Sequence, residues 1–150
     1  MNALESSGPE ETRRLGEALG RAAEAGDVVL LSGELGAGKT VFVQGIARGL
    51  EFEGSVSSKS FVLLGEYAGR ITLYHADLYR LESPLEVEEL ALEEISSDGV
   101  LVVEWPERGD VVLPAERLTV LFEVTGPDTR RITPEASGER AKALAGAIGG

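Results

Sequence analysis

The sequence contains no cysteine and only one histidine, His75. Without cysteine, the chain can form neither disulfides nor thiolate metal sites, and it cannot use a cysteine nucleophile. A single histidine likewise excludes a metal site built from several imidazoles. Lysine is also scarce, because only three of the 14 basic residues are lysines, namely Lys39, Lys59 and Lys142. The chemistry of this chain must therefore rest on carboxylates, hydroxyls, arginines and backbone groups, with lysine at few positions.

Long hydrophobic runs are missing too. The apolar runs are far shorter than the roughly 20 residues that a membrane helix needs, and the N-terminus lacks the basic and apolar pattern of a signal peptide. We therefore expect a cytoplasmic protein with no membrane association, which the absence of cysteine also fits. With 150 residues and 43% hydrophobic content, the chain is expected to form a single domain over residues 1–150 with a sizeable core.

Positive charge is in short supply. The 26 acidic residues outnumber the 14 basic ones and give a formal net charge of −12. Extended binding to nucleic acid needs clustered lysine and arginine, so the balance argues against it. Any nucleic acid that this protein serves is expected to contact a protein partner instead.

A glycine-rich segment at residues 33–40 matches the pattern G-x-x-x-x-G-K-[ST] without a gap. Its glycines allow successive backbone N–H groups to turn inward around a phosphate. Lys39 supplies a positive charge for the β- and γ-phosphates, and the Thr40 hydroxyl is placed to bind the Mg²⁺ that bridges them. The candidate nucleotide-binding residues are Glu34, Leu35, Gly36, Ala37, Gly38, Lys39, Thr40 and Val41.

The context of the motif supports this interpretation over a glycine-rich turn before an ordinary helix. Residues 28–31 form an aliphatic run of buried-strand type, and residues 41–50 have the length and pattern of a helix. Strand, loop and helix are the setting that a phosphate-binding loop requires, so we expect an α/β fold.

Other patterns predict the elements around this unit. Ser7 with Glu10, and Ser83 with Glu86, have capping-box spacing at the start of two helices. The helix that follows Ser83 is acidic, and we expect its glutamates to form a solvated face rather than a partner surface. Helices are expected over residues 7–25, 83–92 and 137–148, and strands over residues 61–67, 71–76, 99–105, 118–125 and 129–133.

Two of these strands end in an acid, which suits the edge of an open α/β sheet where ligands gather. Asp77 is the candidate for holding Mg²⁺, directly or through water, although an aspartate there can also simply form a turn. Glu104 could position the attacking water or hold a metal-bound water. The neighbouring Trp105 could have a functional role or could simply pack in the core, and His75 is expected to have a structural role.

A polar stretch at residues 55–60 separates the motif helix from the next apolar run. The hydroxyls of Ser58 and Ser60 could approach Mg²⁺ or the γ-phosphate, and Lys59 could add charge, so this stretch is a candidate switch. The alternative is a solvated connector.

The glycine-rich motif, the sequence HADLYRL at residues 75–81 and the sequence EWPE at residues 104–107 together resemble the TsaE (YjeE) family over roughly residues 9–125. That resemblance implies a P-loop NTPase fold, with a parallel sheet core flanked by antiparallel strands and helices on both faces. It implies ATP and Mg²⁺ as cofactors, with Thr40 and Asp77 near the metal, Glu104 needed for hydrolysis and Trp105 near the nucleotide. One departure is Ser58-Lys59-Ser60-Phe61, where the family usually has Ser-Pro-Thr-Phe.

The same resemblance implies an ATPase needed for threonylcarbamoyladenosine formation in tRNA. Such a protein acts on the threonylcarbamoyl-transferring complex, meets tRNA only indirectly, and does not carry out the transfer. A P-loop small-molecule kinase is one alternative, although Arg130 and Arg131 lie in a predicted hairpin and make a poor arginine lid. A nucleotide-binding adaptor with negligible hydrolysis is the other.

Overall fold

The computed structural model describes residues 3–34, 36–54, 56 and 64–149. The strands are β1 (Leu4–Ser6), β2 (Val28–Ser32), β3 (Leu64–Tyr67), β4 (Thr72–Asp77), β5 (Gly99–Glu104), β6 (Arg117–Val124) and β7 (Arg130–Ser137). The α-helices are α1 (Pro9–Ala22), α2 (Lys39–Gly49), α3 (Pro84–Glu89), α4 (Leu92–Ile95) and α5 (Glu139–Gly149). Two short 3-10 helices, η1 (Pro106–Arg108) and η2 (Asp110–Val112), follow β5.

The described strands form one sheet with the order β1-β7-β6-β2-β5-β4-β3. Its centre is parallel, because β2 pairs in parallel with both β5 and β6, and β4 pairs in parallel with β5. Antiparallel strands complete the two edges, β3 beside β4 on one side and β7 and β1 beyond β6 on the other. The parallel core with antiparallel flanks is therefore confirmed.

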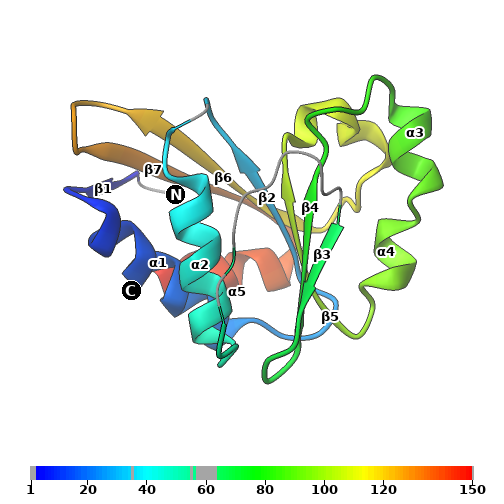
Figure 1. The fold of residues 1–150 in the computed structure, drawn as a ribbon, viewed down its shortest axis with the longest axis horizontal. Helices are drawn as coiled ribbons and strands as arrows, with labels where there is room; N and C mark the ends of the chain where they lie inside the picture. Colours follow the sequence, from blue (N-terminus) through cyan, green and yellow to red (C-terminus); the bar gives the residue numbers. More distant parts are fainter. Residues whose placement is uncertain (1–2, 35, 55, 57–63, 150) are drawn as a thin grey trace.

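Helices cover both faces of the sheet (Figure 1). Side chains alternate along each strand, so Leu73 of β4 joins a core with the residues of α1, α2 and α5, whereas Tyr74 joins a second core with α3 and α4. Strand β5, which lies between β2 and β4, is buried along its whole length, as expected for a strand covered on both sides. No helix in the described ranges has the length and apolar character needed to cross a membrane.

Four glycines bring α1 and α2 into backbone contact. A Cβ added at Gly16 would lie 2.2 Å from the Phe42 carbonyl oxygen, and one at Gly20 would lie 2.3 Å from that of Ile46. On the facing helix, a Cβ at Gly45 or Gly49 would lie 2.1 or 2.2 Å from an α1 carbonyl oxygen. These distances leave no room for a methyl group, so the two helices can pack this closely only with glycine at all four positions.

The start and the end of α1 differ from the sequence-based prediction. Proline takes the first helical position and Gly8 precedes it, so Ser7 is not the N-cap, and its hydroxyl bonds to Glu11 rather than taking part in a box with Glu10. The short strand β1, which the sequence did not reveal, ends just before this turn. The helix ends at Ala22 instead of residue 25, because the chain must turn for the Glu24 N–H to donate to Asp27.

The acidic helix expected over residues 83–92 is in fact two helices. Ser83 caps α3 by accepting a bond from the Glu86 N–H, but the helix stops at Glu89, and Ala91 adopts a left-handed conformation with φ 51°. Val87 and Leu92 both pack into the core, and five residues of continuous helix would turn their side chains about 140° apart. The break at Ala91 lets both face the sheet. The acidic residues on these helices are exposed, as predicted.

We predict that Gly45→Ala destabilises the fold by about 1–3 kcal/mol, because the added methyl group overpacks the contact with α1. Gly146→Ala in α5 is the matched control, since nothing lies within 4 Å of a Cβ there. Alanine favours a helix over glycine by about 1 kcal/mol, so the control should be neutral or stabilising. Urea denaturation midpoints measure both, and equal stability of the two variants would contradict the close packing.

Candidate functional site

Residues 33–40, here called the phosphate loop, join the end of β2 to the start of α2. The backbone is left-handed at Gly36 and Gly38, with φ of 81° and 103°. Residues other than glycine rarely adopt such backbone conformations. Gly38 directly precedes the first residue of α2, which is Lys39. Backbone N–H groups at the head of this helix therefore have no partner within it, which is the arrangement that an anion-binding loop requires.

The side chain of Lys39 is folded back onto its own loop. Its Nζ atom donates a hydrogen bond of 2.6 Å to the Gly33 carbonyl oxygen and lies 4.3 Å from the centroid of the Trp105 ring. The lysine is only 5% exposed, and both of these partners are uncharged. Trp105 thus lies beside the phosphate loop, and a negatively charged ligand would be the stronger partner for this ammonium group.

The two candidate acids lie at the same edge of the sheet, next to the loop. Asp77 and Glu104 end neighbouring parallel strands and are paired in register, and Leu31 at the end of β2 is the partner of Glu104 on its other side. Burial raises the pKa of Asp77, and the nearby Glu104 charge raises it further, whereas a hydrogen bond from the Tyr79 N–H lowers it. A cation at this position would relieve the repulsion between the two carboxylates.

Glu104 is held by the only histidine. Its Oε2 atom lies 2.6 Å from Nε2 of His75, and both residues are buried, with 4% and 8% exposure. His75 lies two residues before Asp77 on β4, so both side chains lie on the same face of the sheet. The structural role that the sequence suggested for His75 is thus a contact with a candidate catalytic group.

Trp105 is fixed in place by its backbone and by stacking. It has φ 58°, a left-handed conformation that a bulky residue adopts only when its surroundings impose it. Its ring lies 4.9 Å from that of Tyr79, and the Arg108 guanidinium lies 5.8 Å from the Tyr79 ring. The chain turns sharply at Trp105 into η1, which directs the indole toward Lys39.

The remaining candidates are placed as follows. Ala37 is buried, Thr40 and Val41 are partly buried, and Glu34 and Gly36 are exposed. Leu35 and the candidate switch residues Ser58, Lys59 and Ser60 lie outside the described residues, so their proposed roles stay predictions.

Comparison with known proteins gives one consistent family. The sequence matches the family described as Threonylcarbamoyl adenosine biosynthesis protein TsaE over residues 6–132. The tRNA threonylcarbamoyladenosine biosynthesis protein TsaE of Treponema pallidum (strain Nichols) is 42% identical over 129 residues, 85% of this chain and 96% of that protein. Its namesake from Bacillus subtilis (strain 168) is 42% identical over 138 residues, 91% of this chain and 86% of that protein.

Structural comparison agrees. The crystal structure of Bacillus subtilis YdiB matches with a TM-score of 0.80 and 35% identity, covering 99% of this chain and 93% of that one. The chain belongs to the TsaE family. Its fold is thus the P-loop NTPase fold expected from the sequence, and it belongs to a family of P-loop ATPases of threonylcarbamoyladenosine biosynthesis.

The structure adds residues to this TsaE site that the sequence motifs did not indicate. A cavity of about 230 Å³ adjoins the phosphate loop and opens between it, the start of α1 and the turn before β7. It is lined by Gly8, Pro9, Thr12, Gly36, Gly38, Val41, Pro127, Asp128 and Arg130. Gly36, Gly38 and Val41 lie in or next to the motif, but no local pattern marks the residues at the start of α1 and in the β6–β7 turn, because only the tertiary fold brings them to the loop.

Arg130 is the most informative of these residues. Its guanidinium donates a 3.2 Å hydrogen bond to the Gly36 carbonyl oxygen, and others to the carbonyls of Gly126 and Thr129. The hairpin that contains it was predicted, but its contact with the phosphate loop was not. Arg130, the first residue of β7, therefore stabilises the phosphate loop by this contact. The next residue, Arg131, instead reaches Glu5 of β1.

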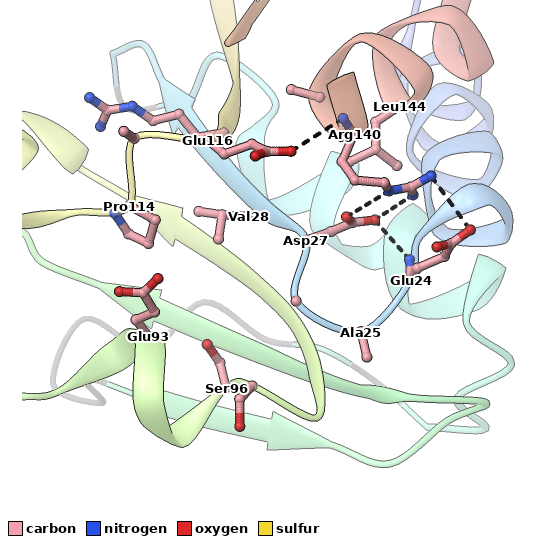
Figure 2. Close-up of a pocket in the computed structure, with 15 residues that line it drawn as sticks. Glu24, Ala25, Asp27, Val28, Glu93, Ser96, Pro114, Glu116, Arg140 and Leu144 are labelled. Atoms are coloured by element: carbon pink, nitrogen blue, oxygen red, sulfur yellow. Dashed lines mark hydrogen bonds and ion pairs between the residues drawn. The ribbon is translucent and has the colours of Figure 1, made fainter. Parts of the chain in front are cut away.

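A second cavity, of about 470 Å³, lies at the opposite end of the parallel strands (Figure 2). There the Arg140 side chain binds both carboxylate oxygens of Asp27, at 3.0 and 2.7 Å, and also reaches Glu24. Asp27 is 5% exposed, and these bonds fasten the start of β2 to α5. Glu24, Asp27 and Glu116 thus all bind Arg140, as the dashed lines in Figure 2 show, and we assign this cluster a structural role.

We predict that Arg130→Ala weakens ADP binding about ten-fold, because the phosphate loop loses its contact at Gly36. Arg131→Ala removes the same charge from the neighbouring position, where the side chain contacts Glu5 instead of the phosphate loop. It should change the ADP affinity by less than about two-fold. Isothermal titration calorimetry measures both. Equal losses in the two variants would show that only the overall charge matters.

Proposed function

We propose that this protein is a Mg²⁺-dependent ATPase that is slow alone and acts on the threonylcarbamoyl-transferring complex of the tRNA modification pathway. The observation that carries this proposal is the meeting of Lys39, Asp77 and Glu104 beside one glycine-rich loop at the edge of the sheet. A lysine for phosphates, an acid for the metal and an acid for water are the parts that phosphoryl transfer to water requires.

The phosphate loop would bind the β- and γ-phosphates through its backbone N–H groups and Lys39. The lysine would exchange its bond to Gly33 for charge-assisted bonds to phosphate oxygens, which are stronger than bonds between neutral groups. The cavity beside the loop would receive the nucleoside, since it opens at Gly36 and Gly38 and is lined by side chains from α1 and the β6–β7 turn.

The residues present fit Mg²⁺. This ion takes oxygen ligands and is usually bound by one or two carboxylates together with phosphate oxygens and water. Thr40 and Asp77 would hold it, with Glu104 close by. In the described ranges no group of three or more histidines and acids is placed to hold a metal ion, so phosphate oxygens and water would have to complete the Mg²⁺ coordination. When bound, Mg²⁺ supplies positive charge against the triphosphate.

Glu104 would orient the attacking water and accept its proton. The water oxygen forms a bond to the γ-phosphorus while the bond from that phosphorus to the β–γ bridging oxygen breaks, which gives ADP and phosphate. Glu104 suits this role because its carboxylate is buried beside the loop, and Trp105 covers Lys39 next to it. Exclusion of bulk water strengthens the interactions of both charged groups with the reacting phosphate.

The charge of the chain favours a protein partner over direct contact with tRNA. A net charge of −12 repels the phosphate backbone, and the described basic side chains are dispersed, several of them in pairs with acids. The relatives are named for threonylcarbamoyladenosine biosynthesis in tRNA. Hydrolysis by this chain would therefore serve turnover of the protein complex that holds the tRNA.

The decisive experiment is ATP turnover by the purified protein, alone and with the threonylcarbamoyl-transferring proteins. We expect slow turnover alone, faster turnover in the complex and no phosphate transfer to free metabolites. Lys39→Ala should bind ATP at least about ten-fold more weakly by calorimetry, because the loop loses its charge. Circular dichroism checks that the variant is folded. Unchanged ATP affinity in Lys39→Ala would contradict phosphate binding by this loop. Formation of phosphorylated metabolites in the turnover experiment would establish the kinase alternative.

Asp77→Asn and Glu104→Gln should separate the two acids. Asp77→Asn should weaken mainly the Mg²⁺-dependent part of ATP affinity, because it removes a charge from the metal site. Glu104→Gln should leave affinity within about three-fold but lower kcat by 10²-fold or more, as expected for a group that acts in the transition state. ATP affinity with and without Mg²⁺ and single-turnover rates distinguish these effects. Identical behaviour of the two variants would contradict the assignment.

A further inference from the structure

The contact between His75 and Glu104 has a geometry that goes beyond packing. Only one oxygen of the Glu104 carboxylate, Oε2, has a hydrogen-bond partner among the described residues, and that partner is His75 at 2.6 Å. The other oxygen, Oε1, has no hydrogen-bond partner there. No fully buried side-chain nitrogen or oxygen in the same ranges lacks a partner, so Oε1 is not fully buried. The histidine therefore contacts one oxygen, while the other makes no hydrogen bond to a described residue.

The main chain of Glu104 is held as well. Its carbonyl accepts a 3.1 Å bond from the Leu78 N–H, which links the ends of β4 and β5, and parallel pairing continues up to Asp77 and Glu104. Because the backbone is fixed, Glu104 can change its conformation only by rotation about its side-chain torsion angles. The bond from His75 is the described contact that restricts them.

The neighbouring charged side chains of Lys39 and Asp77 do not hold Glu104 in this way. Lys39 is bonded to Gly33 and stacked on Trp105, and no hydrogen bond or ion pair between Lys39 and Glu104 is present. Asp77 carries like charge and repels Glu104. Without His75, the buried carboxylate would lose its hydrogen bond, and repulsion by Asp77 would favour rotamers that turn it away from its neighbour.

We propose that His75 is a positioning residue that holds the Glu104 carboxylate in the rotamer used for hydrolysis. The proposal rests on the proposed role of Glu104 and adds the residue that orients it. In this arrangement the Glu104 carboxylate would accept, and Nε2 of His75 would carry the hydrogen and donate it to Oε2. Partners that orient a catalytic or ligating group typically change activity by about 10–100-fold when removed.

The first test compares His75→Leu with His75→Gln in the full-length protein with its protein partners. His75→Leu removes the donor, so kcat should fall at least about ten-fold while the ATP Kd stays within about three-fold. His75→Gln keeps an N–H donor at a similar reach and should recover kcat to within about three-fold of wild type. Tyr74→Phe is the matched control, because it removes a hydrogen bond to Asp98 from the adjacent residue of β4 without touching Glu104.

These variants also reveal a purely structural role. Parallel losses of ATP affinity, thermal stability and kcat in both His75 variants would overturn the proposal. A rise in kcat in His75→Leu would do the same, since it would mean that the histidine restrains Glu104 rather than orienting it.

The second test does not depend on activity, so it separates a failure of this proposal from a failure of the proposed ATPase function. His75 is the only histidine, so its ring nitrogens give a single set of signals in an ¹⁵N-labelled sample. We expect a protonated, hydrogen-bonded Nε2 in the wild type and in Tyr74→Phe, and a clear shift of that signal in Glu104→Gln. Identical signals in the wild type and Glu104→Gln would overturn the proposal, even if His75→Leu cannot be purified in folded form.

Discussion

The position of the site depends on the backbone contact between α1 and α2. α2 begins at Lys39, and α1 begins next to Gly8 and carries Thr12 in its first turn, both of which line the adjoining cavity. If side chains replaced the glycines of this contact, the helices would separate, and the phosphate loop would move away from the start of α1. The close approach therefore sets the distance between the part of the site that would bind phosphates and the part that would receive the nucleoside.

The two ends of the parallel strands have different tasks. At one end, β4 and β5 end in Asp77 and Glu104, and the phosphate loop that follows the adjacent β2 leads to Lys39, as expected where the carboxyl ends of parallel strands meet. At the other end, the pair between Asp27 and Arg140 fastens β2 to the C-terminal helix. The same strand therefore joins a fixed start at Asp27 to a loop whose left-handed turns require glycine.

Much of the fold could be predicted from the sequence because its signals are local. The phosphate loop, the strands that end in Asp77 and Glu104, and the hairpin of β3 and β4 follow from periodicity and glycine spacing. The break at Ala91 escaped prediction because it depends on which core Val87 and Leu92 both face, and β1 escaped because three residues are too few for a pattern. Element boundaries shifted where tertiary contacts, such as Glu24 with Asp27, ended a helix early.

Site residues divide in the same way. Lys39, Thr40, Asp77 and Glu104 stand in motifs, so they could be proposed from the sequence. Arg130 and His75 could not be placed, since the contact from Arg130 to Gly36 spans 94 positions and that from His75 to Glu104 spans 29. Such pairs depend on strand order, which the sequence does not state. A residue type with one copy, such as His75, also offers no pattern from which its partner could be inferred.

The charges at the site favour a ligand that brings both signs. Among the described residues, the ammonium of Lys39 contacts a carbonyl and an aromatic ring, while the partly buried Asp77 lies beside the buried Glu104, and burial together with the Glu104 charge raises the pKa of Asp77. A phosphate alone would help the lysine but repel the acids, and a metal ion alone would help the acids but repel the lysine. A nucleotide with its Mg²⁺ satisfies both groups at once, so each half of the ligand strengthens binding of the other. The same reasoning makes His75 necessary before the ligand arrives, because until then it is the described hydrogen-bond donor that stabilises the buried Glu104 side chain.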